Sequence, residues 1–200
     1  MSGNGADQGA SFAFAPGAMA KVKAIIAKYP PGRQASAVLP LLDLAQREND
    51  GWLSRAAMDH VAQILDMAPI KVYEVATFYT LFNLKPVGRH LVQLCRTTPC
   101  WLRGSEELRY AAQQELGIGL KETTGDGAFT LVEVECLGAC VNAPMVQIND
   151  DFYEDLTGES FRELLRALRR GEKPAIGSRT GRKGSCPASG PTTLTEIERR

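Results

Sequence analysis

Hydrophobic residues in the first half of the chain recur every three or four positions, the spacing that places side chains on one face of a helix. Four such segments follow one another, near residues 18–27, from 38 to 48, from 54 onward and after Pro69. The third begins at Ser54, a residue type that commonly caps the N-terminus of a helix. The pattern predicts a helical bundle over residues 18–85.

The pattern changes beyond Pro86 and Gly88, two residues that commonly interrupt regular structure. Short apolar or alternating runs predict strands, and segments with helical spacing predict two helices. The expected strands cover residues 90–95, 129–134, 145–148 and 152–153, with a turn at 149–151, a polar loop at 121–127, and helices near 101–116 and 161–168. The order β-α-β-β-β-α predicts a small α/β unit over residues 86–172, so the fold class of the chain is α+β or α/β.

Both ends of the chain have a different composition. Residues 1–17 are rich in Gly, Ala and Ser, and residues 173–200 are rich in Gly, Pro, Ser and Thr without hydrophobic periodicity. We expect a disordered N-terminal tail and an extended or disordered C-terminal tail. Residues 1–10 lack the features of a secretory signal, and no run of about 18 apolar residues predicts a membrane span. The chain is expected in a reducing compartment, without membrane insertion.

The 200 residues carry 23 Lys or Arg and 23 Asp or Glu, but the charges are unevenly placed. Residues 101–160 contain twelve acidic and three basic residues, whereas residues 162–183 contain eight basic and two acidic ones. The basic stretch is short and poor in aromatic residues, which does not fit a nucleic-acid-binding surface. It predicts either a solvated helix face or a docking strip for an acidic partner.

Four of the five cysteines form two pairs, Cys95 with Cys100 and Cys136 with Cys140, and 35 residues separate the pairs. Each pair lies at the end of a predicted strand, where an α/β fold can bring two loops together. Four convergent thiolates in a reducing compartment indicate a metal site, either iron–sulfur or zinc. The fifth cysteine, Cys186, lies in the C-terminal tail and is expected to be a non-ligand thiol.

The spacing within each pair helps to choose between these sites. Structural zinc tolerates both spacings, but the absence of C-x2-C knuckles makes iron–sulfur the favoured interpretation. The bacterial [4Fe–4S] motif, the full plant-type motif and the C-x-x-C motif of thiol exchange are all absent. His60 and His90 stand alone and are interpreted as structural, which argues against a Rieske centre. One cysteine pair per iron suits [2Fe–2S], while zinc and redox-active thiols stay open as alternatives.

The residues beside the cysteines are compatible with a cluster site. Gly138 permits a close backbone approach or a positive φ. Backbone N–H groups of residues 96–98 and 137–139 are candidate donors to sulfur, which would raise a reduction potential. The nearby carboxylates of Glu133 and Glu135 would lower it.

Two segments around these cysteines closely resemble one protein family. They are residues 95–105 (CRTTPCWLRGS) and 135–150 (ECLGACVNAPMVQIND), and the likeness extends upstream to residues 75–82 (VATFYTLF). Over residues 21–171 the chain resembles the small thioredoxin-like [2Fe–2S] subunits of NADH:quinone oxidoreductase, respiratory complex I. Small subunits of NAD-linked hydrogenases and formate dehydrogenases share the cysteine pattern, but the TTPCWLRGS run and the helical extension favour complex I.

The resemblance implies a thioredoxin-like ferredoxin domain behind the helical bundle, with one [2Fe–2S] cluster held by Cys95, Cys100, Cys136 and Cys140. It implies electron exchange with FMN, which a partner flavoprotein subunit binds together with NADH. A second implied partner is the large iron–sulfur subunit of the peripheral arm. The chain would act within a proton-translocating NADH dehydrogenase that reduces quinone, with no catalytic residues of its own. It would lie on the inner face of the membrane, cytoplasmic in bacteria or on the matrix side in mitochondria.

Overall fold

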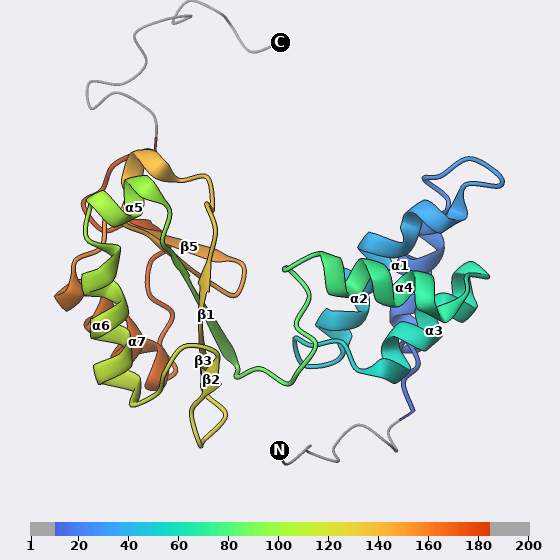
Figure 1. Cartoon of the computed structure of the whole chain (residues 1–200), viewed down its shortest axis with the longest axis horizontal. Coiled ribbons are helices and arrows are strands. Elements are labelled where there is room, and N and C mark those ends of the chain that lie inside the picture. The colour runs from blue at the N-terminus through green and yellow to red at the C-terminus, as the bar shows by residue number, and fades with distance from the viewer. Residues whose placement is uncertain (1–10, 185–200) are drawn as a thin grey trace, which may run out of the picture. The chain divides into compact units, whose positions relative to one another are not determined.

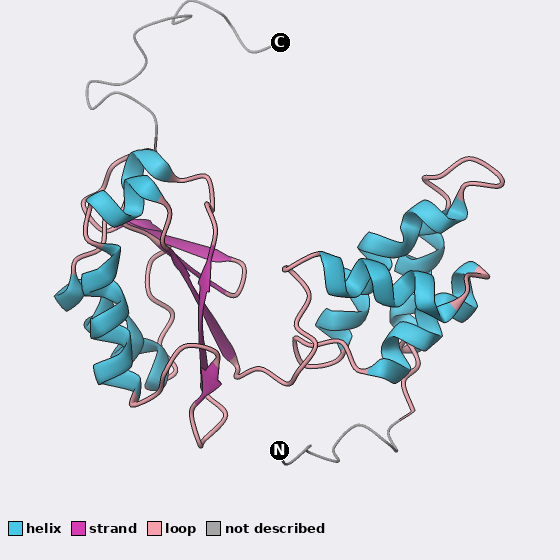
Figure 2. Ribbon diagram, in the orientation of Figure 1, coloured by secondary structure: helices cyan, strands magenta, loops and turns pink. Residues whose placement is uncertain are grey.

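The computed structural model describes residues 11–184, and the chain divides between Val87 and Gly88 into two compact units. The sequence predicted this boundary two residues earlier, between residues 85 and 86. Figure 1 labels most of the helices and strands of both units, and Figure 2 shows that the first unit is helical whereas the second contains the sheet. Each unit has a hydrophobic core of its own.

The first unit consists of helices joined by short loops. They are α1 (Pro16–Ile26), α2 (Val38–Glu48), α3 (Arg55–Leu65) and α4 (Pro69–Phe78), with the 3-10 turn η1 (Gln34–Ala37) before α2. The side-chain oxygen of Ser54 accepts a hydrogen bond from the N–H of Ala57, as expected for the cap of α3. Pro69 occupies the first turn of α4, where its missing N–H is not needed.

The N-terminal segment corrects the prediction of a tail over residues 1–17. Phe14 is only 6% exposed and belongs to the helical core, and α1 already begins at Pro16. The rings of Phe12 and Phe14 lie 5.8 and 5.5 Å from the ring of His60. The prediction is therefore wrong for residues 12–17, because two phenylalanines in this Gly- and Ala-rich segment bury apolar surface. Residues 1–10 lie outside the described part of the chain.

The second unit is built on a six-stranded mixed sheet in the order β2-β3-β1-β4-β5-β6. The strands are β1 (His90–Cys95), β2 (Glu122–Thr123), β3 (Phe129–Val134), β4 (Val146–Ile148), β5 (Asp151–Glu154) and β6 (Gly177–Ser178). β1 and β3 are parallel neighbours with Cys95 opposite Val134, while β4 pairs antiparallel with β1 and with β5. The carboxyl ends of β1 and β3 therefore meet at one edge of the sheet.

Helices α6 (Ser105–Leu116) and α7 (Gly158–Arg169) lie side by side on one face of this sheet (Figure 1). Their apolar faces and the inner face of the sheet form one core, which includes Leu108, Phe129, Leu131, Phe161 and Leu164. The sequence predicted a single helix over residues 101–116, which is wrong, because α5 (Thr98–Leu102) and α6 are separate. Gly104 between them has a φ of +100°, a conformation that interrupts the helix and that glycine adopts readily.

Two short strands lie in segments that the sequence predicted as irregular. β2 lies in the polar 121–127 segment and pairs with β3, with the hydroxyls of Thr123 and Thr130 2.7 Å apart. β6 lies in the predicted C-terminal tail and pairs with β5, so the second unit extends beyond residue 172. The turn after β4 is also shorter than residues 149–151, because Asp151 already pairs with Ile148.

Candidate metal centre

The sheet brings the two cysteine pairs together at one edge. Cys95 is the last residue of β1, and Cys136 follows the end of the neighbouring strand β3 by two residues. Cys100 lies in α5, immediately after β1, and Cys140 is the first residue of the 3-10 turn η2 (Cys140–Asn142). The parallel pairing of β1 and β3 is therefore what makes two loops, distant in sequence, neighbours in space.

Short contacts connect the sulfur atoms with their surroundings. The Sγ atoms of Cys136 and Cys140 are 3.4 Å apart. The backbone N–H of Gly138 donates to Cys136 Sγ across 3.4 Å, as expected for the backbone of residues 137–139. The hydroxyl of Thr97 lies 3.5 Å from Cys95 Sγ. The cysteine loops thus supply donors to sulfur from their own backbone and from one threonine.

The two pairs differ in their exposure to solvent. Cys95 and Cys100 are 2% and 1% exposed and pack with Ala143 and Met145 in a small apolar cluster. Cys136 is exposed and Cys140 is half-buried. One pair is therefore shielded from water, and the other pair faces the surface.

Within the first loop, burial and hydrogen bonds act on the two thiols in opposite ways. Burial raises the pKa of Cys95, but hydrogen bonds from the Thr97 hydroxyl and from the backbone of Leu137 and Thr97 outweigh it, so this pKa lies below its ordinary value. Burial, reinforced by the adjacent Cys95 thiol, raises the pKa of Cys100 to about 12. Cys95 is therefore the thiol of this pair that ionises first.

In the second loop, too, the pKa of one thiol is lowered and that of the other is raised. The hydrogen bond from the backbone of Gly138, followed by that from the Cys140 thiol, lowers the pKa of Cys136. The hydrogen bond with Cys136, followed by partial burial, raises the pKa of Cys140. Each loop thus favours the thiolate at one position, and the thiolate is the form that binds metal ions.

The donor set and its arrangement fit a [2Fe–2S] cluster. Such clusters are held by four cysteine thiolates. Among residues 11–184, no group of three or more His, Cys, Asp or Glu side chains is arranged so that it could hold one metal ion. Two pairs, each on its own loop, are what a cluster with two cysteines per iron requires.

Charged residues near the site are largely paired. Arg96 lies 2.8 Å from Glu133, and Arg109 lies 4.0 Å from the same carboxylate. The negative charge of Glu133, expected from the sequence to act on the site, is therefore paired mainly with Arg96, because Arg109 lies closer to Glu106, at 2.8 Å. The predicted structural histidines lie elsewhere, since His60 packs on phenylalanines of the first unit and His90 stacks on Phe129.

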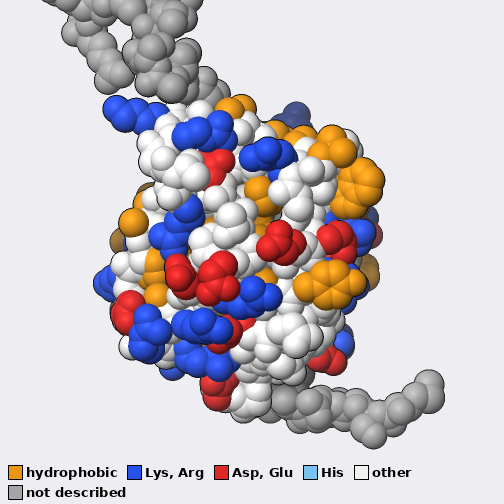
Figure 3. Space-filling model, turned by 90° about the vertical axis from the view of Figure 1, so that its left-hand side faces the viewer, with side chains coloured by type: hydrophobic (Ala, Val, Ile, Leu, Met, Phe, Trp, Pro, Cys, Tyr) orange, Lys and Arg blue, Asp and Glu red, His pale blue; other side chains and the backbone are white. Residues whose placement is uncertain are grey.

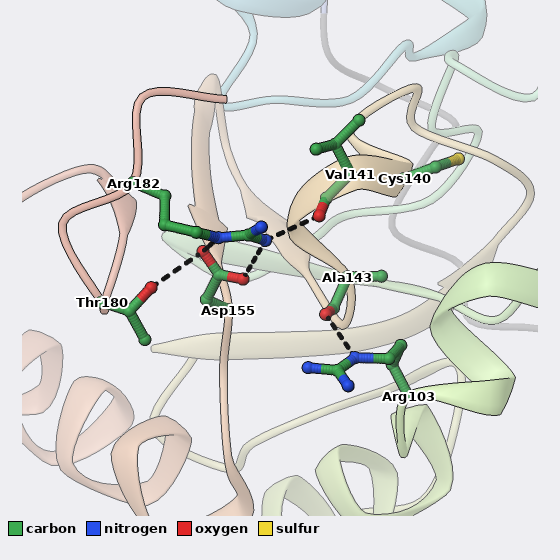
Figure 4. Close-up of a pocket in the computed structure, with 7 residues that line it drawn as sticks. All are labelled: Arg103, Cys140, Val141, Ala143, Asp155, Thr180 and Arg182. Atoms are coloured by element: carbon green, nitrogen blue, oxygen red, sulfur yellow. Dashed lines mark hydrogen bonds and ion pairs between the residues drawn. The ribbon is translucent and has the colours of Figure 1, made fainter. Parts of the chain in front are cut away.

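A pocket of about 470 Å³ opens beside Cys140 (Figure 4). Its lining comes from α5–α6, η2, the end of β5 and the C-terminal segment, and comprises Arg103, Cys140, Val141, Ala143, Asp155, Thr180 and Arg182. The sequence identified Cys140 as a site residue, but it did not identify Asp155 or Arg182 as part of this pocket. Only the tertiary structure places them there, since no local motif marks them. Cys186, the predicted non-ligand, lies outside the described residues.

The basic stretch of residues 162–183 is mostly engaged within the chain. Arg166 pairs with Glu115 of α6, and Arg170 pairs with Glu172. Arg162 also lies 3.5 Å from Glu159. The face of the molecule in Figure 3 accordingly shows basic and acidic side chains interspersed. This arrangement supports the interpretation as a solvated helix face over that of a docking strip.

Four thiols at one edge of a small mixed sheet, in a unit that follows a separate helical unit in the sequence, are the features of a ferredoxin-type protein. The sequence pattern of the family described as thioredoxin-like [2Fe-2S] ferredoxin matches residues 22–169. The chain belongs to this family, which confirms the predicted fold and implies one [2Fe–2S] cluster. None of the helices in residues 11–184 is both long and apolar enough to cross a membrane.

Similar proteins cover most of the chain. The "NADH dehydrogenase [ubiquinone] flavoprotein 2, mitochondrial" of Dictyostelium discoideum is 54% identical over 185 residues, 92% of this chain and 75% of that protein. An NADH-quinone oxidoreductase subunit of Rickettsia bellii is 55% identical over 159 residues, 80% of this chain and 95% of its own length. A crystal structure of an NAD+-reducing [NiFe]-hydrogenase shares the fold with a TM-score of 0.60 at 18% identity, over 68% of this chain and 25% of that chain.

Proposed function

We propose that this chain is the [2Fe–2S] electron-transfer subunit of an NADH:quinone oxidoreductase, and that Cys95, Cys100, Cys136 and Cys140 hold its cluster. The observation that carries the proposal is the meeting of both cysteine pairs at the edge formed by β1 and β3. Relatives with the names given above are more than half identical over most of the chain. As a complex I subunit, the chain has other complex I subunits as its partners.

The residues of the site would bind the [2Fe–2S] cluster and shield part of it from water. When bound, the [2Fe–2S] cluster supplies reversible one-electron transfer. Cys95 and Cys100 would hold it from the buried side, where they pack with Met145 and Ala143 away from water. Cys136 and Cys140 face the surface, the side from which another subunit can approach. The chain's part in the reaction is to set the distance and the potential, with no active site of its own.

Within the complex, the proposed direct partners of this chain are two subunits. One is the flavoprotein subunit that binds NADH and FMN, and the other is the large iron–sulfur subunit of the peripheral arm. Support comes from apolar side chains that remain exposed beside the cysteines. Trp101 and Leu102 follow Cys100 and are 59% and 71% exposed, and Val141 follows Cys140 and is 56% exposed. Exposed aromatic and aliphatic side chains of this kind are typical of protein interfaces. The chain would then lie peripherally on the inner face of the membrane, cytoplasmic or on the matrix side.

Visible absorption and low-temperature EPR spectra of the anaerobically purified protein test the proposal, before and after dithionite. A red-brown protein is expected, EPR-silent when oxidised and with a rhombic S = 1/2 signal when reduced. A colourless protein that contains zinc would overturn the electron-transfer role and favour a zinc-stabilised interaction module. Mass spectrometry of the co-purifying subunits distinguishes complex I from a hydrogenase or a formate dehydrogenase.

A further inference from the structure

Residues 172–184 form a C-terminal strap that returns from the end of α7 to the sheet. β6 within the strap pairs parallel with β5, with Gly177 opposite Tyr153 and Ser178 opposite Glu154. The N–H of Arg179 also donates to the carbonyl of Glu154 across 3.0 Å. The strap is thus fixed along β5, on the way toward the second cysteine loop.

Asp155, just beyond β5, is the centre of the contacts made by the strap. Its side chain is 7% exposed and accepts hydrogen bonds from the hydroxyls of Ser178 at 2.6 Å and Thr180 at 3.3 Å. Arg182 donates to both of its carboxylate oxygens, from Nε at 3.2 Å and from Nη2 at 2.6 Å. This bidentate contact fixes the plane of the guanidinium group.

The same guanidinium reaches the turn that carries Cys140. Its Nη2 donates to the carbonyl oxygen of Val141 across 2.6 Å (Figure 4). Two further hydrogen bonds tie the turn to the same part of the chain, from the N–H of Asp155 to the carbonyl of Asn142 at 2.8 Å and from Asn142 Nδ2 to Glu154 at 2.5 Å. Of these three, only the bond from Arg182 reaches the residue next to Cys140.

We propose that Arg182 is a positioning residue for the metal centre, clamping the carbonyl of Val141 so that Cys140 keeps its place in the ligand set. The inference rests on the proposed function, because it concerns the same four thiols. Its physical basis is directional: a guanidinium can hold a carboxylate with two donors and still direct another N–H at a carbonyl. Lysine carries the same charge but lacks this planar fork.

Arg182→Lys in the full chain with its cluster separates positioning from charge, and Arg179→Lys is the matched control. Arg179 lies on the same strap, but its guanidinium lies over the Tyr153 ring and donates to Ala175, away from the cysteine loop. We expect Arg182→Lys to release iron to a chelator about tenfold faster than the wild type, since a hydrogen bond from a charged donor is lost. It should also broaden the EPR signal and speed amide hydrogen exchange at Asn142 and Ala143, while Arg179→Lys changes none of these.

Iron release and exchange in Arg182→Lys that equal the wild type would overturn the proposal. Arg182→Met supplies a second test, because it removes the charge as well. The reduction potential could shift in Arg182→Met while iron release and amide exchange stay unchanged in both variants. This result would show that Arg182 acts only through its charge, and it would also overturn the proposal. A wild-type protein without a [2Fe–2S] spectrum would refute the proposed function instead, and amide exchange would still report whether Arg182 clamps the turn.

Discussion

The backbone N–H of Gly138 donates a hydrogen bond to the Sγ atom of Cys136 across 3.4 Å. Gly138 has a φ of +85°, and this left-handed conformation lets the loop turn its N–H back toward a sulfur two residues earlier. A Cβ atom at this position would meet no heavy atom within 4 Å. Any cost of a larger residue here is therefore backbone strain and not a steric clash.

Gly138→Ala is expected to weaken this contact. The left-handed conformation costs an alanine about 1–2 kcal/mol, so the variant either loses that much stability or moves its backbone and gives up the hydrogen bond. In the second case the reduction potential of the cluster falls, because donors to sulfur favour the reduced state. A redox titration followed by EPR, with chemical unfolding alongside, measures both effects. Gly125→Ala is the control, because that position has free space around it and no positive φ. An unchanged reduction potential together with unchanged stability in Gly138→Ala would show that the left-handed conformation of Gly138 does not matter.

Cys136→Ser is expected to abolish or destabilise the cluster without unfolding the first unit. A serine hydroxyl replaces a thiolate ligand, and the helical core shares no residue with the core around the sheet. Iron and sulfide analysis together with far-UV circular dichroism measures the two parts separately. Cys186→Ser is the control and should retain all of its iron. Full iron content in Cys136→Ser would remove Cys136 from the proposed ligands.

Local sequence patterns predicted most elements because their causes are local. α2 and α3 follow from helical periodicity and from the Ser54 cap, and the strands at residues 90–95 and 129–134 follow from short apolar runs. The two cysteine pairs could also be recognised from the short spacing within each pair. In each case a few neighbouring residues contain the whole signal.

The parts that sequence did not predict depend on contacts between distant segments. Arg182 reaches Val141, 41 residues earlier, and β6 exists only because β5 offers it an edge. Phe14 is buried in the core of the helical unit, next to His60 of α3, which composition alone does not show. The contact of the Thr97 hydroxyl with Cys95 is local, but its hydrogen bond to Cys136, which also lowers the pKa of that thiol, exists only because the second loop approaches it. Tertiary context, not local propensity, decides these features.

The division of the chain into two units predicts two separable unfolding transitions. Leu131 is fully buried in the sheet unit and Leu41 is fully buried in the helical unit. Replacing either by alanine removes about 2–5 kcal/mol from the unit that contains it. In differential scanning calorimetry, Leu131→Ala should lower only the transition that coincides with loss of the visible absorption, and Leu41→Ala only the other. Equal shifts of both transitions in either variant would show that the chain unfolds as a single unit.

The contact between Asp155 and Arg182 predicts a stability that depends on pH. Burial alone would raise the pKa of Asp155, but the hydrogen bonds from Arg182 and Ser178 outweigh it and hold the pKa below its usual value. A carboxyl group with a lowered pKa in the folded state stabilises the fold at pH values above its unfolded pKa of about 3.9, and loses this contribution as the pH falls through the folded pKa. Asp155→Asn should therefore cost about 1–3 kcal/mol at neutral pH and progressively less in acid.

Urea unfolding of the wild type and of Asp155→Asn at several pH values from 7 down to about 3 measures this difference. Asp151→Asn, an exposed residue of β5, is the control and should show little change at any pH. The two curves should approach one another as the pH falls through the lowered folded pKa of Asp155, because the carboxyl group then becomes neutral like the amide. A difference that stays constant across the whole range would mean that the ionised carboxylate is not what holds the strap, and that hydrogen bonds available equally to an amide do so instead.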